Sequence, residues 1–202
     1  MKKILFGLAA IALFTTLAFT VGDPLPIGSN MPKANLKMQD ISGKQVAIQD
    51  AKKDNGVLVM FSCNTCPYVV KNQERTIAIS DYALKNNIGV IILNSNEAQR
   101  TDDDSYAAMQ AYAKAQGYKW NYVVDKTNMV ADAFGANRTP ECFLFNKDLK
   151  LVYHGAIDDS PSDESAIKRI HLKEAITEMA AGKEVTVKES RSVGCSIKRS
   201  KM

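Results

Sequence analysis

The feature that most constrains this chain is a buried-strand pattern that leads directly into a Cys-x-x-Cys motif. The continuous apolar run Val57–Phe61 is typical of a strand that is covered on both faces. Cys63 and Cys66 follow it, and Pro67 then opens an apolar pattern of helical spacing that predicts a helix over residues 67–86. The motif is therefore expected where a strand turns into the N-terminus of a helix.

This position favours thiol chemistry at Cys63. A thiolate is the reactive form of cysteine, and the free N–H groups and dipole of a helix N-terminus stabilise an anion. We therefore expect a lowered pKa for Cys63. Cys66 lies three residues further on and can reach back to it. The predicted reaction is a two-step exchange in which Cys63 attacks a partner disulfide and Cys66 resolves the mixed disulfide, in a direction that the sequence leaves open.

The motif has three other interpretations. A zinc site would need two further ligands, yet no second Cys-x-x-Cys occurs and His154 and His171 are isolated. A copper carrier could use Cys63, Cys66 and His154, and a noncatalytic binding domain could hold the motif as a permanent disulfide. Redox exchange is favoured because the strand-to-helix context suits it, and neither a metal nor another cofactor is expected.

Strand and helix patterns alternate along the rest of the chain. They predict an α/β fold with a mixed central sheet flanked by helices, opened by an N-terminal β-hairpin and carrying an inserted β-α unit. The hairpin turns at 40–44, where Ser42-Gly43 supplies backbone freedom. The other expected elements are strands at 90–93 and 121–124, a strand pair at 142–145 and 149–153, and helices at 105–116, 128–134 and 163–181.

The N-terminus indicates export. Lys2 and Lys3 precede an apolar run from residue 4 to about 19, which is shorter than the about 20 residues that span a bilayer. We expect a cleaved signal peptide at 1–22, a single α/β domain at 23–182 and a basic tail at 183–202. The mature protein is then periplasmic or secreted. An uncleaved membrane anchor is the alternative, and membrane association is expected only in that case.

Charge argues against a nucleic-acid partner. The chain carries a formal net charge of +4, but the first segment contributes +2 and residues 183–202 contribute +4, so the body between them carries −2. Nucleic-acid binding needs basic residues gathered on a folded face. The charges of the tail are expected to be solvated. Expected partners are protein or small-molecule thiols and disulfides, together with an electron donor that the sequence does not identify.

A second motif, Arg138-Thr139-Pro140, enters the predicted strand pair. With the Cys-x-x-Cys, it makes the chain resemble the thioredoxin-like redoxins, whose fold places a cis-proline loop opposite the cysteines. X-Pro bonds are the ones where the cis form is cheap. The resemblance implies that Arg138, Thr139 and Pro140 contact the substrate, that Cys63 is the accessible cysteine and that Cys66 lies beneath the helix turn. An ordinary strand-opening proline is the alternative.

The resemblance narrows to the peroxiredoxin-like redoxins related to alkyl hydroperoxide reductase and thiol-specific antioxidant proteins. Peroxiredoxins carry a proline and a peroxide-binding threonine where this chain has Gly56 and Met60. The methionine side chain has no hydrogen-bond donor and cannot replace the threonine hydroxyl. Peroxide reduction is therefore the second hypothesis, after disulfide exchange. The resembling segments are Cys63-Asn64-Thr65-Cys66-Pro67-Tyr68-Val69, Asn94-Ser95-Asn96, Arg138-Thr139-Pro140, Tyr153-His154-Gly155-Ala156-Ile157-Asp158-Asp159 and Gly194-Cys195-Ser196-Ile197-Lys198.

Three residues near these motifs receive structural interpretations. Cys142 lies in an apolar strand and is expected to be a buried core residue. Glu141 could accept a proton near Cys66, but a solvated carboxylate is the preferred interpretation. His154 is expected to be a hydrogen-bonded structural histidine.

Cys195 is predicted to be a third redox thiol. It lies in an apolar cluster within a charged tail, and an idle exposed thiol in an oxidising compartment would invite crosslinks. We expect the tail to fold back and bring Cys195 close to Cys63 or Cys66. A structural disulfide with Cys142 and a frayed terminus are the alternatives.

Overall fold

The computed structural model describes residues 22–200, so the predicted signal peptide lies almost entirely outside the described residues. Within that range the chain forms a seven-stranded sheet and a separate two-stranded one. The strands are β1 (Met38–Asp40), β2 (Gln45–Val46), β3 (Gly56–Ser62), β4 (Ile88–Asn94), β5 (Asn121–Val124), β6 (Arg138–Thr139), β7 (Glu141–Asn146), β8 (Leu151–Gly155) and β9 (Cys195–Ser196).

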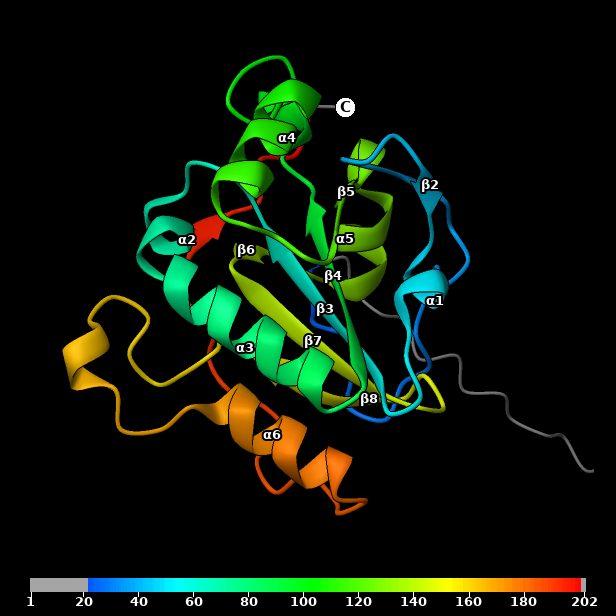
Figure 1. The fold of residues 1–202 in the computed structure, drawn as a ribbon, viewed down its shortest axis with the longest axis vertical. Helices are drawn as coiled ribbons and strands as arrows, with labels where there is room; N and C mark the ends of the chain where they lie inside the picture. The colour runs from blue at the N-terminus through cyan, green and yellow to red at the C-terminus, as the bar shows by residue number, and fades with distance from the viewer. Residues whose placement is uncertain (1–21, 201–202) are drawn as a thin grey trace, which may run out of the picture.

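The large sheet is mixed, as predicted, and has the order β2-β1-β5-β4-β3-β7-β8 (Figure 1). Its centre is parallel, since β4 runs alongside both β3 and β5 in the same direction. The outer strands are antiparallel: β1 and β2 form the predicted N-terminal hairpin on one side, and β7 and β8 form the second pair on the other. The central strands are thus covered on both edges.

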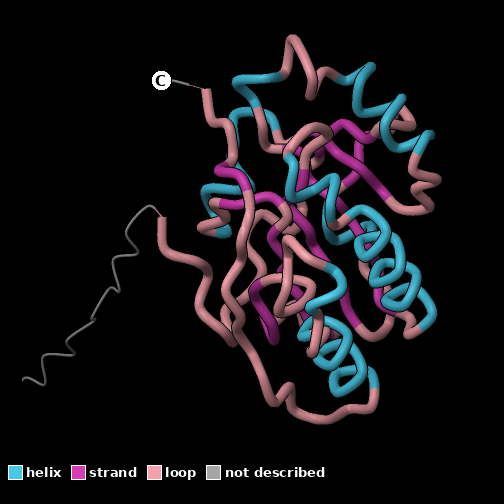
Figure 2. The backbone as a smooth tube through the Cα atoms, turned by 90° about the vertical axis from the view of Figure 1, so that its left-hand side faces the viewer, coloured by secondary structure: helices cyan, strands magenta, loops and turns pink. Residues whose placement is uncertain are grey.

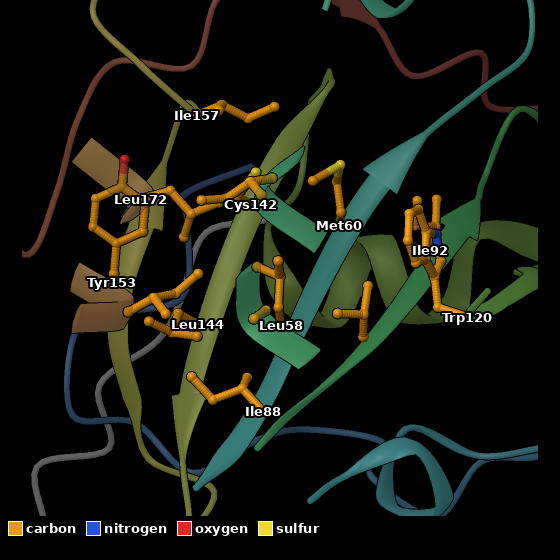
Figure 3. Close-up of a cluster of buried hydrophobic side chains, with 14 of the residues drawn as sticks. Leu58, Met60, Ile88, Ile92, Trp120, Cys142, Leu144, Tyr153, Ile157 and Leu172 are labelled. Carbon is orange, nitrogen blue, oxygen red and sulfur yellow. The ribbon is translucent and has the colours of Figure 1, made fainter. Parts of the chain in front are cut away.

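Helices cover both faces of this sheet. Side chains of β3 alternate between two buried clusters, with Leu58 and Met60 in one and Val59 and Phe61 in the other, which explains its continuous apolar run. Figure 3 shows the first cluster, which α3, α4 and α6 cover, whereas α1 and α5 cover the second. The helices are α1 (Ile48–Ala51), α2 (Pro67–Lys71), α3 (Gln73–Lys85), α4 (Tyr106–Ala115), α5 (Met129–Phe134) and α6 (His171–Ala180), with 3-10 turns at Glu97–Gln99, Lys126–Asn128 and Glu164–Ala166.

Two predicted helices are shorter in the structure. The helix expected over 67–86 is divided into α2 and α3 at Asn72, whose side chain donates to the carbonyls of Tyr68 and Pro161. The helix expected over 163–181 begins only at His171, because Asp159 binds the backbone of Lys168 and Arg169 and holds the preceding segment out of helical form. No helix among the described residues is long and apolar enough to cross a membrane.

The segment after α6 follows the domain rather than leaving it. It runs mostly as loop from α6 to the red strand β9 beside α2 in Figure 1, and Figure 2 shows the same path in a second view. Val185 is buried in the core. The His154 N–H donates to the Lys188 carbonyl, and the Ser190 N–H donates to the His154 carbonyl. The backbone of residues 185–197 thus lies along the domain, as the predicted folding back of the tail requires, while most of the charged side chains of the tail are exposed.

Candidate functional site

The Cys-x-x-Cys motif and the proline loop meet at one end of the sheet. β3 and β7 pair with Phe61 opposite Glu141, so the residues just after β3 and just before β7 are brought together. The Thr139-Pro140 peptide bond is cis, as the resemblance implies. Cys66 caps α2 and Pro67 begins it. The predicted strand-to-helix junction therefore faces the cis-proline loop.

Thr139 contacts both cysteines of the motif. Its hydroxyl Oγ1 lies 3.5 Å from the sulfur of Cys63, and its carbonyl oxygen lies 3.4 Å from the sulfur of Cys66. Thr139 is 1% exposed, and Pro140 is also buried. Thr139 therefore holds the two sulfurs from within the protein, whereas the prediction that it contacts substrate is not tested by these contacts.

Cys66 forms a disulfide with Cys195, and their Cα atoms lie 6.1 Å apart. Cys63 and Cys142 are free thiols. β9 pairs antiparallel with β6, with Cys195 opposite Thr139 and Ser196 opposite Arg138. The tail thus folds back onto the motif as expected, and Cys142 is not the partner of Cys195. A redox role for Cys195 stays a prediction.

Close backbone contact brings β9 against the proline loop. A Cβ atom at Gly194 would overlap the carbonyl group of Thr139, so only glycine fits at this position. On the other side of Cys195, the Ile197 side chain is 5% exposed and packs in the second core cluster. The apolar cluster noted in the sequence is therefore the anchor of the tail.

The cysteines of the motif are enclosed in this state. Cys63 is 1% exposed and Cys66 is 5% exposed, whereas Cys195 is partly exposed. The expectation that Cys63 is the accessible cysteine is therefore wrong for the disulfide-bonded form. The three cysteines line one pocket of about 240 Å³, together with Thr65, Pro67, Asn96, Gln99 and Lys198.

The predicted lowering of the Cys63 pKa is also wrong for this form. Burial raises the pKa of the Cys63 thiol, and the nearby Asp104 carboxylate raises it further. The Thr139 hydroxyl and the backbone N–H groups of Cys66 and Thr65 act in the opposite direction, but burial has the larger effect. The N–H groups at the start of α2 thus favour the thiolate, as predicted, but desolvation outweighs them.

Asp104 is the main site residue that the sequence reasoning missed. Its side chain is fully buried and accepts hydrogen bonds from the Asn64 backbone N–H at 2.9 Å, and from the Asn94 and Asn96 amides at 2.6 and 2.8 Å. No role for it was predicted from the sequence. Asn94 and Asn96, which stand among the resembling segments, were the available signal. The Tyr122 hydroxyl completes this network by donating to the Asn64 side chain.

Glu141 is buried rather than solvated, which corrects the preferred interpretation. One of its carboxylate oxygens accepts from the backbone N–H groups of Asn137 and Arg138, both at 2.8 Å. The other lies 2.7 Å from His154 Nε2, which bears out the structural interpretation of that histidine. Glu141 therefore fixes the backbone that enters the cis-proline loop.

The remaining candidates are placed as follows. Arg138 is exposed and donates to the Ser196 hydroxyl at 3.1 Å, so the tail holds its guanidinium. Cys142 is fully buried in the core, as predicted, and burial raises the pKa of its thiol. Met60 is buried in the core and Gly56 lies so close to Phe145 that a Cβ would overlap its carbonyl oxygen. The two residues at the positions of the peroxiredoxin proline and threonine therefore pack in the interior of the domain.

No group of three or more histidine, cysteine, aspartate or glutamate side chains suited to holding a metal occurs among the described residues. The Nε2 atom of His154, which the copper hypothesis joins to Cys63 and Cys66, lies 2.7 Å from the Glu141 carboxylate.

The fold and the site define a thioredoxin-like thiol redox protein. The chain belongs to the Redoxin family, whose model matches residues 22–170. Its Redoxin domain and the Cys66–Cys195 disulfide support thiol-based redox activity. A search of curated proteins gives no significant match.

Solved structures support the same fold. An uncharacterized conserved protein from Geobacillus kaustophilus is 31% identical, with a TM-score of 0.81 over 88% of this chain and 94% of that one. A hypothetical protein from Sinorhizobium meliloti is 29% identical, with a TM-score of 0.81 over 89% and 98% of the two chains. The peroxidoxin BcpB from Mycobacterium tuberculosis is 13% identical, with a TM-score of 0.58 over 77% and 96%, and shows a likeness of fold alone.

The Cys63 microenvironment gives a testable expectation. In protein with the Cys66–Cys195 disulfide intact, the pKa of Cys63 should lie above the about 8.5 of a free thiol, because burial disfavours the thiolate. Thr139→Val removes the hydroxyl that favours the thiolate and should raise this pKa further. Ultraviolet thiolate absorbance against pH measures both values.

Thr65→Val is the matched control, since the Thr65 side chain is exposed and only its backbone N–H favours the thiolate. It should leave the Cys63 pKa unchanged. A pKa at or below that of a free thiol in the unaltered protein would contradict the burial argument.

Proposed function

We propose that this protein is an exported thiol-disulfide oxidoreductase whose redox pair is Cys63 and Cys66. The observation that carries the proposal is a free Cys63 thiol placed beside a Cys66 that is already in a disulfide, with both sulfurs against Thr139 of the cis-proline loop. A structural disulfide needs no free thiol next to it, whereas an exchange site does.

The exchange begins from the form in which all three cysteines are reduced. Cys63 loses its proton to water, and its thiolate attacks one sulfur of the substrate disulfide. A mixed disulfide forms and the other substrate sulfur leaves as a thiolate. The Cys66 thiolate then attacks the Cys63 sulfur, which releases the second substrate thiolate and leaves a Cys63–Cys66 disulfide. The substrate gains two electrons and two protons, and the protein loses them.

The enclosed form is the resting form in this scheme. With Cys63 buried and its pKa raised, the thiol stays protonated at neutral pH and reacts slowly. Cys66 is bonded to Cys195, so it has no free thiol that could resolve a mixed disulfide. Reduction of that disulfide therefore has to precede substrate exchange.

A cysteine trap tests the proposal. In Cys66→Ala/Cys195→Ser, Cys63 lacks both sulfurs that could resolve a mixed disulfide, and Cys142 is buried in the core. Substrate proteins should accumulate on Cys63 as mixed disulfides, seen as dithiothreitol-sensitive bands on nonreducing gels and identified by mass spectrometry. The single change Cys66→Ala is less suitable, because Cys195 would remain as a competing thiol.

The triple variant that adds Cys63→Ser is the control, and it should trap nothing. If the double variant also yields no mixed disulfide while its Cys63 can still be alkylated, the proposed exchange is wrong.

The export part of the proposal rests on the N-terminal sequence. Lys2 and Lys3 followed by an apolar run are typical of a signal peptide, and residues 1–21 lie outside the described structure. We expect the mature protein to begin near residue 23 and to reach the periplasm or the medium. N-terminal sequencing of protein from fractionated cells measures this directly, and a chain that starts at Met1 in the cytoplasm would contradict it.

Peroxide reduction is the second candidate, supported by the Thr139 hydroxyl 3.5 Å from the Cys63 sulfur. The threonine position of peroxiredoxins is nevertheless a core methionine, Met60. Because one missing hydrogen-bond donor to a developing charge costs about 100-fold or more in rate, we expect hydrogen peroxide to be consumed at least that much more slowly than by a peroxiredoxin. A stopped-flow assay on reduced protein measures this rate. Fast, saturable consumption that is lost in Cys63→Ser would instead make peroxide reduction the leading function.

A further inference from the structure

We propose, on the basis of the exchange function above, that Cys195 is the point at which a dithiol reductant delivers electrons, and that Cys66 passes them on to Cys63. Cys66 is the cysteine that belongs to two alternative disulfides. It pairs with Cys195 in the structure and with Cys63 in the oxidised product of exchange. The three sulfurs line the same pocket. We call this arrangement the three-cysteine relay.

Exposure orders the three cysteines. Cys63 is 1% exposed, Cys66 is 5% exposed and Cys195 is partly exposed. A thiol that approaches from solvent therefore meets Cys195 first. Attack on a disulfide requires access to the sulfur that is attacked, so the disulfide should open by attack at Cys195 with Cys66 as the leaving group.

The chain before Cys195 is held without help from the disulfide. The Ser190 hydroxyl accepts from the Ala156 backbone N–H at 2.9 Å and lies 2.7 Å from the Tyr153 hydroxyl. The Ser190 backbone N–H donates to the His154 carbonyl at 3.0 Å. Gly194 rests directly on the Thr139 carbonyl. The approach of the tail to the site is thus fixed by hydrogen bonds and close packing.

The chain after Cys195 is held as well. Ile197 is buried, and its backbone N–H donates to the Asn137 carbonyl at 3.1 Å. The Lys198 N–H donates to the Asn96 side chain at 2.9 Å, and its carbonyl accepts from the Ala98 N–H at 2.9 Å. Arg199 forms an ion pair with Asp132 at 2.8 Å. These contacts keep Cys195 beside Cys66 after the disulfide is reduced, which a relay requires.

The relay follows three steps from the oxidised product. The Cys195 thiolate attacks the Cys66 sulfur, so that the Cys63–Cys66 bond breaks, Cys63 leaves as a thiolate and takes up a proton, and the observed Cys66–Cys195 disulfide forms. One thiolate of the dithiol reductant then attacks the Cys195 sulfur, and Cys66 leaves. The second reductant thiolate attacks its partner sulfur and releases Cys195. The reductant ends as a disulfide, and two electrons have reached the protein.

Mapping of the first attack tests the entry point. Protein with the Cys66–Cys195 disulfide is treated with a limiting amount of glutathione, quenched in acid within the first turnover, alkylated and digested for mass spectrometry. We expect glutathione on Cys195 and alkylation on Cys66, with a preference of about tenfold or more, because Cys195 is the more exposed partner of this disulfide. The mapping is made on the unaltered chain and on Cys63→Ala. A folding defect in the variant would therefore leave the result for the unaltered chain valid.

Glutathione found mainly on Cys66 would overturn the proposal. This mapping uses only the disulfide between Cys66 and Cys195. Its result therefore does not depend on whether Cys63 exchanges with substrates, and a failure of the trap on Cys63 is a separate outcome.

The second measurement compares half-reactions. In Cys195→Ser, reduction of the Cys63–Cys66 disulfide by dithiothreitol should slow by about tenfold or more relative to its oxidation by oxidised glutathione, because the reductant has to reach enclosed sulfurs. Ser192→Ala is the matched control in the same tail, since the Ser192 hydroxyl has no hydrogen-bond partner among the described residues. It should leave the ratio of the two rates unchanged. An unchanged ratio in Cys195→Ser, or a slowing of oxidation alone, would show that Cys195 is not the entry point.

Discussion

The pairing of β3 with β7 is the constraint on which the site depends. The two strands are paired without interruption from Gly56 opposite Asn146 to Phe61 opposite Glu141, and both are buried. A shift of one residue would send every apolar side chain to the opposite face of the sheet. Packing of the core therefore fixes the register, and the register in turn sets the cysteine motif against the proline loop.

Thr139, in that loop, lies next to all three cysteines of the site. Its hydroxyl meets Cys63, its carbonyl lies against Cys66 and its backbone is paired opposite Cys195. Glu141, two residues further on, secures the loop from beneath by binding the Arg138 N–H. The geometry of the three sulfurs is thus set by backbone that is buried and hydrogen-bonded, as a preorganised site requires.

The sequence predicted the fold, because alternating strand and helix patterns are local and run along the whole chain. The meeting of the cysteine motif with the cis-proline loop came from the resemblance to the redoxins, and the structure has the same arrangement. The sequence did not predict that Asp104 and Glu141 are buried, since a carboxylate is usually solvated and neither local pattern shows that backbone N–H and side-chain donors converge on it in the fold. The raised Cys63 pKa was also missed: the position of a cysteine at a helix N-terminus is a local property, whereas its burial and its proximity to Asp104 arise only in the fold.

The Asn96 side chain joins two parts of the molecule that are otherwise described separately. Its oxygen accepts from the Lys198 N–H of the tail, and its amide donates to Asp104, which in turn accepts from the Asn64 N–H between the two cysteines. Docking of the tail and the conformation of the cysteine loop are therefore thermodynamically linked. Linkage of this kind is reciprocal. If the redox state of the loop changes the affinity of the tail by some factor, a ligand that displaces the tail changes the redox equilibrium of the loop by the same factor.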